Sequence, residues 1–181
     1  YPGALLEFQK SLDYTNIDET IMINNITYIV KVYATLGKWE QFATLTAKYL
    51  DICLLNPDFC ITYGIFLNEI KKNYPEAEKF YKMALNFNPD KYPFVIYELA
   101  SITWKPLLFL GIMNFNQKNW GQAKSYLEKA LTFTNNVWQI QYYLIITLAR
   151  LNNKLEARNL FKKSIALFPE MEKKILIDHL N

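Results

Sequence analysis

The chain has 181 residues, of which 51% are hydrophobic and 16% aromatic, and its formal net charge is +3. Such a chain can bury a sizeable core, and its charge is close to balanced. Its lysines are scattered in runs no longer than pairs, such as Lys71-Lys72, so we expect no nucleic-acid partner, because binding to phosphates needs clustered cations.

Helical periodicity recurs along the chain and no run of strict alternation indicates a strand, so the sequence predicts an all-α fold. Turn residues separate the periodic segments, among them Gly37-Lys38, Asn88-Pro89 and Asn152-Asn153. In chain order we expect helices at about 4–14, 19–36, 39–55, 58–72, 75–87, 93–116, 120–133, 137–151, 154–167 and 170–180.

One short pattern occurs five times, each time at the start of a helical segment. Its copies are Tyr1-Pro-Gly-Ala4, Trp39-Glu-Gln-Phe42, Tyr74-Pro-Glu-Ala77, Trp120-Gly-Gln-Ala123 and Lys154-Leu-Glu-Ala157. The fourth residue recurs after 38 residues from 4 to 42, 35 from 42 to 77, 46 from 77 to 123 and 34 from 123 to 157. These intervals predict an array of repeats with a unit near 34 residues.

A unit of this length, built as helix, turn, helix, resembles the tetratricopeptide repeat. The resemblance covers nearly the whole chain and implies an α-solenoid, in which antiparallel helix pairs stack into a right-handed superhelix with one concave and one convex face. The implied parts are the second helix of a truncated repeat at 1–16, a divergent repeat at 19–57, repeats at 58–90, 104–136 and 137–169, an inserted apolar helical segment at 91–103 and a capping helix at 170–181.

The family pattern is matched unevenly. The match is best from Leu107 to Asn135, where Gly111 is the small residue expected between paired helices, and the stretch from Tyr74 to Pro89 matches as well. The weakest match is the unit from Ile23 to Pro57, because Phe42 and Tyr49 stand where small residues are usual. We expect the two helices of that unit to lie further apart or to cross differently.

Residues 1–16 read as a second helix without a first helix ahead of it. Its apolar face then lacks a partner of its own, although the next unit can cover part of it; the residues of that face are Leu5, Leu6, Phe8 and Leu12. We therefore expect a fragment of a longer protein, and the absence of a signal peptide here says nothing about the whole protein. Abundant lysine, asparagine and isoleucine favour an AT-rich bacterial source, with the cytoplasm, cell envelope or periplasm all open.

The segment from Lys91 to Thr103 is the surplus of the 46-residue interval. We expect either one long kinked helix or two helices from 93 to 116, since Pro93 suits a helix start and Pro106 would interrupt the helix in its course. A membrane span is disfavoured because Glu98, Lys105 and Pro106 would lie in the hydrocarbon. A helix that extends past the stack would expose a second docking surface, for which the candidates are Phe94, Ile96 and Tyr97.

Neither catalytic nor cofactor chemistry is indicated. The five glycines are too dispersed for a phosphate-binding loop, and His179 is the only histidine, so we expect no enzyme, no cofactor and no metal site. Cys53 and Cys60 lie seven residues apart, which is wider than typical metal or redox pairs. They read as two buried thiols, with a disulfide across the turn at Asn56-Pro57 as the open alternative.

The resemblance implies that the first helix of each unit faces a concave groove. Counting along those helices gives an aromatic-rich set of candidate groove residues: Asn24, Thr27, Tyr28, Lys31, Phe59, Thr62, Tyr63, Phe66, Phe109, Ile112, Phe115, Asn116, Gln139, Tyr142, Tyr143, Ile146 and Arg150. Cations are too few here to hold a partner's terminal carboxylate, so the set favours an apolar or amphipathic protein segment. The alternative is that these rings are core.

The sequence therefore predicts a non-catalytic scaffold or adaptor that binds a partner protein in this groove. Two other functions remain open. The array could be a self-associating assembly module, which would form a homo-oligomer, or it could be a regulatory domain of a larger protein.

Overall fold

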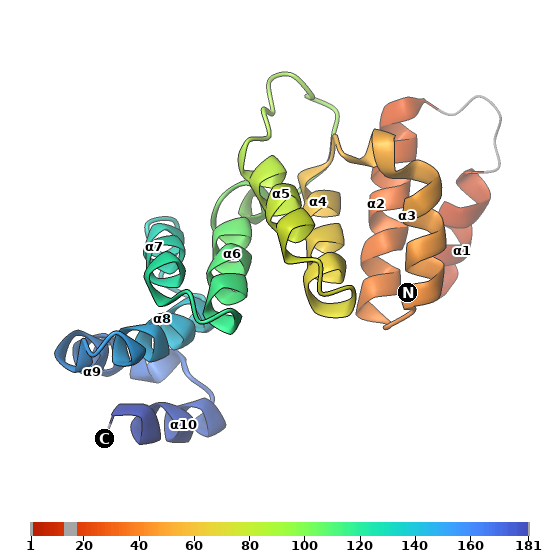
Figure 1. Ribbon diagram of the computed structural model, residues 1–181. Coiled ribbons are helices and arrows are strands. Elements are labelled where there is room, and N and C mark those ends of the chain that lie inside the picture. The colour runs from red at the N-terminus through yellow and green to blue at the C-terminus, as the bar shows by residue number, and fades with distance from the viewer. Residues whose placement is uncertain (1, 13–17, 181) are drawn as a thin grey trace. The chain divides into compact units, whose positions relative to one another are not determined.

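The structure is a computed structural model that describes residues 2–12 and 18–180, without the side chains of residues 2, 4, 5 and 11. The described residues contain no strand, which confirms the all-α prediction (Figure 1). Their α-helices are α1 (Pro2–Ser11), α2 (Glu19–Thr35), α3 (Trp39–Cys53), α4 (Pro57–Ile65), α5 (Tyr74–Leu85), α6 (Trp104–Asn116), α7 (Trp120–Leu131), α8 (Trp138–Arg150), α9 (Lys154–Ser164) and α10 (Glu170–Leu180).

The chain forms two compact units, Tyr1–Ile102 and Thr103–Asn181, which we call unit 1 and unit 2. In unit 1, α2 packs against α1, α3 and α4, and α4 packs against α5. In unit 2, α6 packs against α7 and α8, while α8 also packs against α7, α9 and α10. Because short turns join α2 to α3, α6 to α7 and α8 to α9, the helices of each of these pairs run antiparallel.

Capping residues explain where several helices begin. The carboxylate of Asp18 accepts hydrogen bonds from the first backbone N–H groups of α2, and the side-chain oxygen of Asn56 does the same for α4. Pro57 follows Asn56 directly and has no N–H to leave unsatisfied at the first helical position. Asn73 caps α5 by accepting from the Glu76 N–H group.

The same backbone turn recurs between the two helices of each pair. In each copy one residue has a left-handed φ, and the second helix begins two residues later; these residues are Gly37 (66°), Lys72 (54°), Lys118 (61°) and Asn152 (64°). In three of the turns the next residue donates its N–H to the carbonyl five residues earlier, as Asn119 does to Asn114 over 2.9 Å. This is the hydrogen bond of a Schellman helix end.

The remaining turn, between α4 and α5, is one residue longer than the other three. The end of α4 widens into a π-helical turn, η1 (Phe66–Ile70), where the Lys71 N–H donates to the Phe66 carbonyl. The Asn73 N–H then bonds the carbonyl of Leu67, six residues back, over 2.9 Å. The extra residue is absorbed inside this turn, so α5 still starts two residues after the left-handed Lys72.

Two glycines let paired helices approach closely. A Cβ atom on Gly111 of α6 would lie 2.7 Å from Leu127 of α7, which agrees with the role expected for Gly111. A Cβ atom on Gly64 of α4 would lie 2.5 Å from the ring of Tyr81 in α5. Real Cβ contacts are longer than this, so any larger residue would push the helices or side chains apart.

Helix α3 departs from regular geometry at the position that the sequence marks as unusual. Tyr49 has φ −124° and ψ 16°, so α3 is kinked there. Phe42 is fully buried, and its ring lies 4.7 Å from that of Phe66 in η1 and 5.7 Å from that of Trp39.

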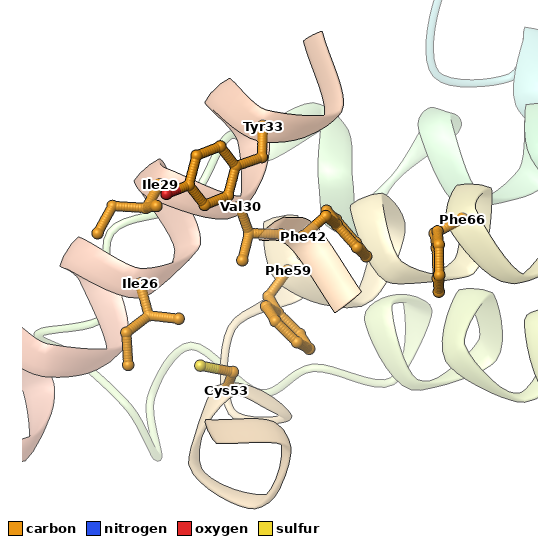
Figure 2. Packing of buried hydrophobic residues seen from close by; sticks show 8 residues of the cluster. All are labelled: Ile26, Ile29, Val30, Tyr33, Phe42, Cys53, Phe59 and Phe66. Atoms are coloured by element: carbon orange, nitrogen blue, oxygen red, sulfur yellow. The ribbon is translucent and has the colours of Figure 1, made fainter. Parts of the chain in front are cut away.

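The core of unit 1 is built from one face of α2 together with residues of α3, α4 and η1 (Figure 2). The buried members are Ile26, Ile29, Val30, Tyr33, Phe42, Cys53, Phe59 and Phe66. Phe8 and Leu12 of the first segment pack against this cluster, while Leu6 is exposed. Residues 13–16, and the side chain of Leu5, which were expected to continue that helix and its apolar face, lie outside the described residues.

The helix expected from 93 to 103 is not formed. Residues 95–98 have no regular secondary structure, and only a short 3-10 helix, η2 (Leu99–Ile102), precedes α6. Instead, side chains of distant helices hydrogen-bond the backbone of residues 94, 96 and 98. Phe94 ends a turn in which the Val95 N–H donates to the Tyr92 carbonyl, and residues 95–98 follow without helical structure; we call residues 94–98 the 94–98 segment.

The last helix of unit 2, α10, closes one side of its neighbours α8 and α9. Leu176 and Leu180 are buried, and the guanidinium of Arg158 in α9 donates two hydrogen bonds, of 3.1 and 2.7 Å, to the Leu180 carbonyl. Across residues 2–12 and 18–180, none of the helices has both the length and the apolar character that crossing a membrane requires.

Candidate interaction faces

The α2 and α4 helices of unit 1 together hold the backbone of the 94–98 segment. The side-chain amide of Asn24 bonds it twice: Nδ2 donates to the Phe94 carbonyl over 3.2 Å, and Oδ1 accepts from the Ile96 N–H over 2.9 Å. Asn56 donates from Nδ2 to the Ile96 carbonyl over 3.0 Å. Two asparagine amides thus replace the partners that a neighbouring strand would supply.

The side chain of Asn56 both caps α4 and hydrogen-bonds the 94–98 segment. Its Oδ1 accepts from the N–H groups of Asp58 and Phe59 at the start of α4, which fixes the amide plane. Its Nδ2 group then faces the Ile96 carbonyl. Because Asn56 is fully buried, its orientation is set by the fold and does not have to be selected on binding.

A charged cluster holds the end of the segment. Asp58, which is buried, accepts from the Glu98 N–H over 3.0 Å through Oδ1 and from the Lys31 ammonium over 2.9 Å through Oδ2. Lys31 also bonds the Glu98 carboxylate over 2.6 Å. Burial lowers the pKa of Lys31, but the bonds to Glu98 and Asp58 outweigh it and raise the pKa above its usual value, so the ammonium stays charged.

A hollow of about 220 Å³ lies beside the segment on the same face. Phe8 and Tyr28 form part of its wall, with ring centroids 4.3 Å apart. Thr27 also lines it, and within the described part of the chain the buried Thr27 hydroxyl has no hydrogen-bond partner. The remaining lining residues are Asn24, Asn25, Lys31, Asp58 and Ile96.

Three aromatic residues expected in the groove belong to the core of unit 1 or pack against it. Phe59 and Phe66 have exposed fractions of 0% and 4%, so their side chains are unavailable to a partner. Tyr63 is half-buried, and its ring lies 4.7 Å from that of Phe80 and 5.7 Å from that of Phe59. Of the candidates in unit 1, Asn24, Tyr28 and Lys31 are therefore brought together at the surface, Phe59 and Phe66 are core, and Tyr63 packs against that core while staying half-buried.

The aromatic candidates of unit 2 form a chain of half-buried rings on α6 and α8. Phe115 makes edge-to-face contacts with Tyr143 and Trp120, at 5.1 and 5.2 Å, and Tyr143 lies 5.4 Å from Tyr142. Burial, and next to it the charge of Glu172, raises the pKa of Tyr142. Phe109 is half-buried, while Asn116 and Arg150 are exposed.

The second docking surface expected at the insertion is only partly exposed. Phe94 and Ile96 have exposed fractions of 78% and 74%. Tyr97 is half-buried instead, because its ring packs edge-to-face on that of Phe87 at 5.0 Å. Leu99, which the sequence did not single out, is 71% exposed.

Both cysteines are free and buried, so the disulfide alternative is not realised. Burial raises the pKa of each thiol to about 12, and for Cys60 the neighbouring Cys53 adds to the shift. Groups of three or more potential metal ligands do not occur among the described residues.

Asn56 and Asp58 are the site residues that the sequence did not reveal. Both belong to the Asn56-Pro57-Asp58 stretch, which reads as a turn followed by a helix start. The pattern predicts the cap but contains no sign of the extended segment 40 residues later in the chain.

Comparison with known proteins adds no identity: no protein-family model, no curated protein and no solved structure matches this chain.

Proposed function

We propose that this chain is a non-catalytic protein-interaction module of the tetratricopeptide-repeat type, which holds an extended segment of a partner protein along faces made by the first helices of its repeats. The observation that carries the proposal is that Asn24, Asn56 and Asp58 hold an extended stretch of polypeptide by its backbone. Side chains that satisfy the N–H and carbonyl groups of an extended chain are what a peptide-binding face needs.

The repeat assignment within this proposal is supported by local geometry. The same left-handed residue precedes the second helix of four pairs, and glycines allow close approach in two of them. The alanines that recur at the start of the second helices, Ala77, Ala123 and Ala157, all have an exposed fraction of 0%. These features recur at nearly the same intervals as the sequence pattern.

In unit 2, the proposed anchors are the half-buried rings of α6 and α8. Aromatic side chains with one exposed edge are common centres of binding energy, because they bury a large area with few rotatable bonds. Asn116 and Arg150 are exposed and were assigned to the same face from the sequence, so they would supply polar contacts at its rim.

The test is a selection of extended peptides from a displayed random library against the whole chain, followed by affinity measurements on variants. We expect the selected peptides to lose at least about tenfold in affinity on Tyr142→Ala with Arg150→Ala, or on Asn24→Ala with Lys31→Ala. The matched control is Leu155→Ala with Lys163→Ala, which removes one exposed apolar side chain and one cation from α9. Peptides that respond only to the control, or a library without binders, would contradict the proposal.

Self-association is the second candidate function, and the exposed Phe94 and Ile96 favour it. A second copy of the chain could cover these side chains. If so, light scattering will detect a concentration-dependent dimer that Phe94→Asp abolishes. A monomer at all accessible concentrations rules this candidate out.

A further inference from the structure

Asn24, Lys31, Asn56 and Asp58 form the surface that holds the 94–98 segment, and we call it the α2–α4 face. We propose that the 94–98 segment occupies this face as an internal ligand, and that a partner segment of matching chemistry replaces it there. The matching partner is an extended stretch with a carboxylate side chain positioned to meet Lys31. This inference rests on the proposed function and names the site, the resident occupant and the class of partner.

The contacts follow the two-residue period of an extended chain. The backbone groups held by the face belong to residues 94, 96 and 98, and the intervening Val95 is buried on the opposite side of the alternation from the exposed Phe94 and Ile96. In an extended chain, alternate residues present their backbone groups to the same edge. The face therefore binds the backbone N–H and carbonyl groups along one edge of the segment.

The spacing on α2 matches the spacing on the strand. Asn24 and Lys31 are seven residues apart, which is about 10 Å along a helix. Two to four residues of extended chain, from the two bonds of Asn24 to Glu98, cover about 7–13 Å. The segment can thus lie along α2 and meet both side chains without distortion.

The side chains of the segment differ in how far they contact unit 1. Phe94 and Ile96 are largely exposed, whereas Val95 is buried and the Tyr97 ring packs on that of Phe87. The carboxylate of Glu98 pairs with Lys31. A replacing segment needs free N–H groups at the positions of Ile96 and Glu98, which excludes proline there, and a carboxylate at the second of these positions.

The internal segment leaves part of the site unfilled. The hollow of about 220 Å³ beside Ile96 is lined by the rings of Phe8 and Tyr28 and by the unpaired hydroxyl of Thr27. A partner with a larger polar side chain at the position of Ile96, which lines this hollow, could fill the space and give Thr27 a hydrogen-bond partner. Such a partner would have contacts that the internal segment lacks. These contacts would provide the additional binding free energy needed to displace the segment.

Competition must overcome the advantage of a tethered occupant. A segment joined to its site by a short connection has an effective concentration on the order of millimolar. A free peptide with the same contacts and a dissociation constant near 100 μM would bind the unmodified chain about tenfold more weakly than a chain without the internal segment.

The experiment uses the whole chain with residues 94–98 replaced by alternating glycine and serine, and a labelled peptide that carries the sequence of residues 92–101. We expect the peptide to bind this chain at least about tenfold more tightly than the unmodified chain. Adding Lys31→Ala, or a peptide with glutamine in place of the glutamate, should remove most of that gain, whereas adding Lys79→Ala, on α5 and paired only with Glu76 among the described ion pairs, should not. Equal binding to the replaced and unmodified chains would overturn the inference.

A second measurement applies if the replaced chain does not fold, which rapid reaction of its two thiols would reveal. In the unmodified chain, a large excess of the same peptide should speed hydrogen exchange at the Ile96 and Glu98 amides about tenfold, because displacement frees them. Unchanged exchange at both amides in the presence of millimolar peptide would overturn the inference.

The two proposals can fail separately. If the replaced chain binds the 92–101 peptide but the library yields no binders, the partner function fails and the internal ligand stands. If the library yields binders that depend on Tyr142 and Arg150 but the 92–101 peptide never binds, the internal-ligand inference fails and the interaction function stands.

Discussion

The corresponding faces of the two units are built from different chemistry. On α2 and α4 of unit 1, polar side chains of fixed orientation hold the backbone of the 94–98 segment, while Phe59 of α4 and Phe66 of η1 are buried in the core. On α6 and α8 of unit 2, the rings stay half-buried and contact one another edge-to-face. The same stripe of the repeat thus serves as core in one unit and as a partly exposed surface in the other.

The contrast between Phe59 and Tyr142 should give the largest effect. We expect Phe59→Ala to lower the free energy of unfolding by about 3–5 kcal/mol, because it removes a fully buried ring and leaves a cavity. Tyr142→Ala should cost only about 1–2 kcal/mol, since its ring is half-buried. Urea denaturation followed by circular dichroism measures both, and equal losses would mean that the two faces do not differ in burial.

The buried thiols give a probe of unit 1 alone, because both cysteines of the chain lie there. With a pKa of about 12, the thiolate fraction at pH 8 is about a thousandfold below that of an ordinary cysteine, so a disulfide reagent should react at most about a thousandth as fast as with the urea-unfolded chain. Three of the four tryptophans lie in unit 2, so their fluorescence reports mainly on that unit. Thiol and fluorescence transitions at different urea concentrations would show that the units unfold separately. Fast thiol reaction in the native chain would contradict the burial.

Substitutions at the close-contact glycines should change stability by a smaller amount in each unit. Gly64→Ala should destabilise by about 1–3 kcal/mol, because the new methyl group meets the buried ring of Tyr81. Gly111→Ala should destabilise by a similar amount, because the new methyl group meets Cγ and Cδ2 of the fully buried Leu127. The matched control is Gly121→Ala in α7, which meets nothing within 4 Å and should stabilise by up to about 1 kcal/mol. Thermal unfolding of the three variants measures these changes in stability. If Gly64→Ala left the stability unchanged, the close approach of α4 and α5 would be refuted.

The recurring turn gives the smallest effects. Lys118→Gly should raise stability by about 1 kcal/mol, because Lys118 holds a left-handed φ that only glycine adopts without strain. Gly37→Ala makes the reverse change in unit 1 and should lower stability by a similar amount. Paired urea titrations measure both. If the two changes have the same sign, the turns of the two units are not equivalent.

Much of the fold could be predicted because local signals fix it. The pattern that includes Trp39, Tyr74, Trp120 and Lys154 marks the start of a second helix each time, and those four positions are where α3, α5, α7 and α9 begin. Asparagine and proline before a helix have direct consequences for its first N–H groups, so the helix starts were readable from the residues alone.

The insertion could not be predicted in the same way. Its apolar residues Val95, Ile96 and Tyr97 are compatible with a buried helix by periodicity, and their conformation is decided by a set of side chains far away in sequence. Helical periodicity also identifies the apolar face at Phe59 and Phe66 without saying whether a neighbouring helix covers it. The structure places Asn24 and Lys31 on one face, and it buries Phe59 and Phe66, which the sequence had assigned to the groove.

The π-helical turn at Phe66–Ile70 has a consequence for how such a chain can change length. One residue added inside an ordinary helix rotates everything after it by about 100°, which would turn the buried face of the next helix toward water. Here the addition is confined to a single wide turn at the helix end, and Tyr81 still meets the glycine opposite it. Single-residue insertions and deletions at this point are a mutational route that leaves the inter-helix contacts in register.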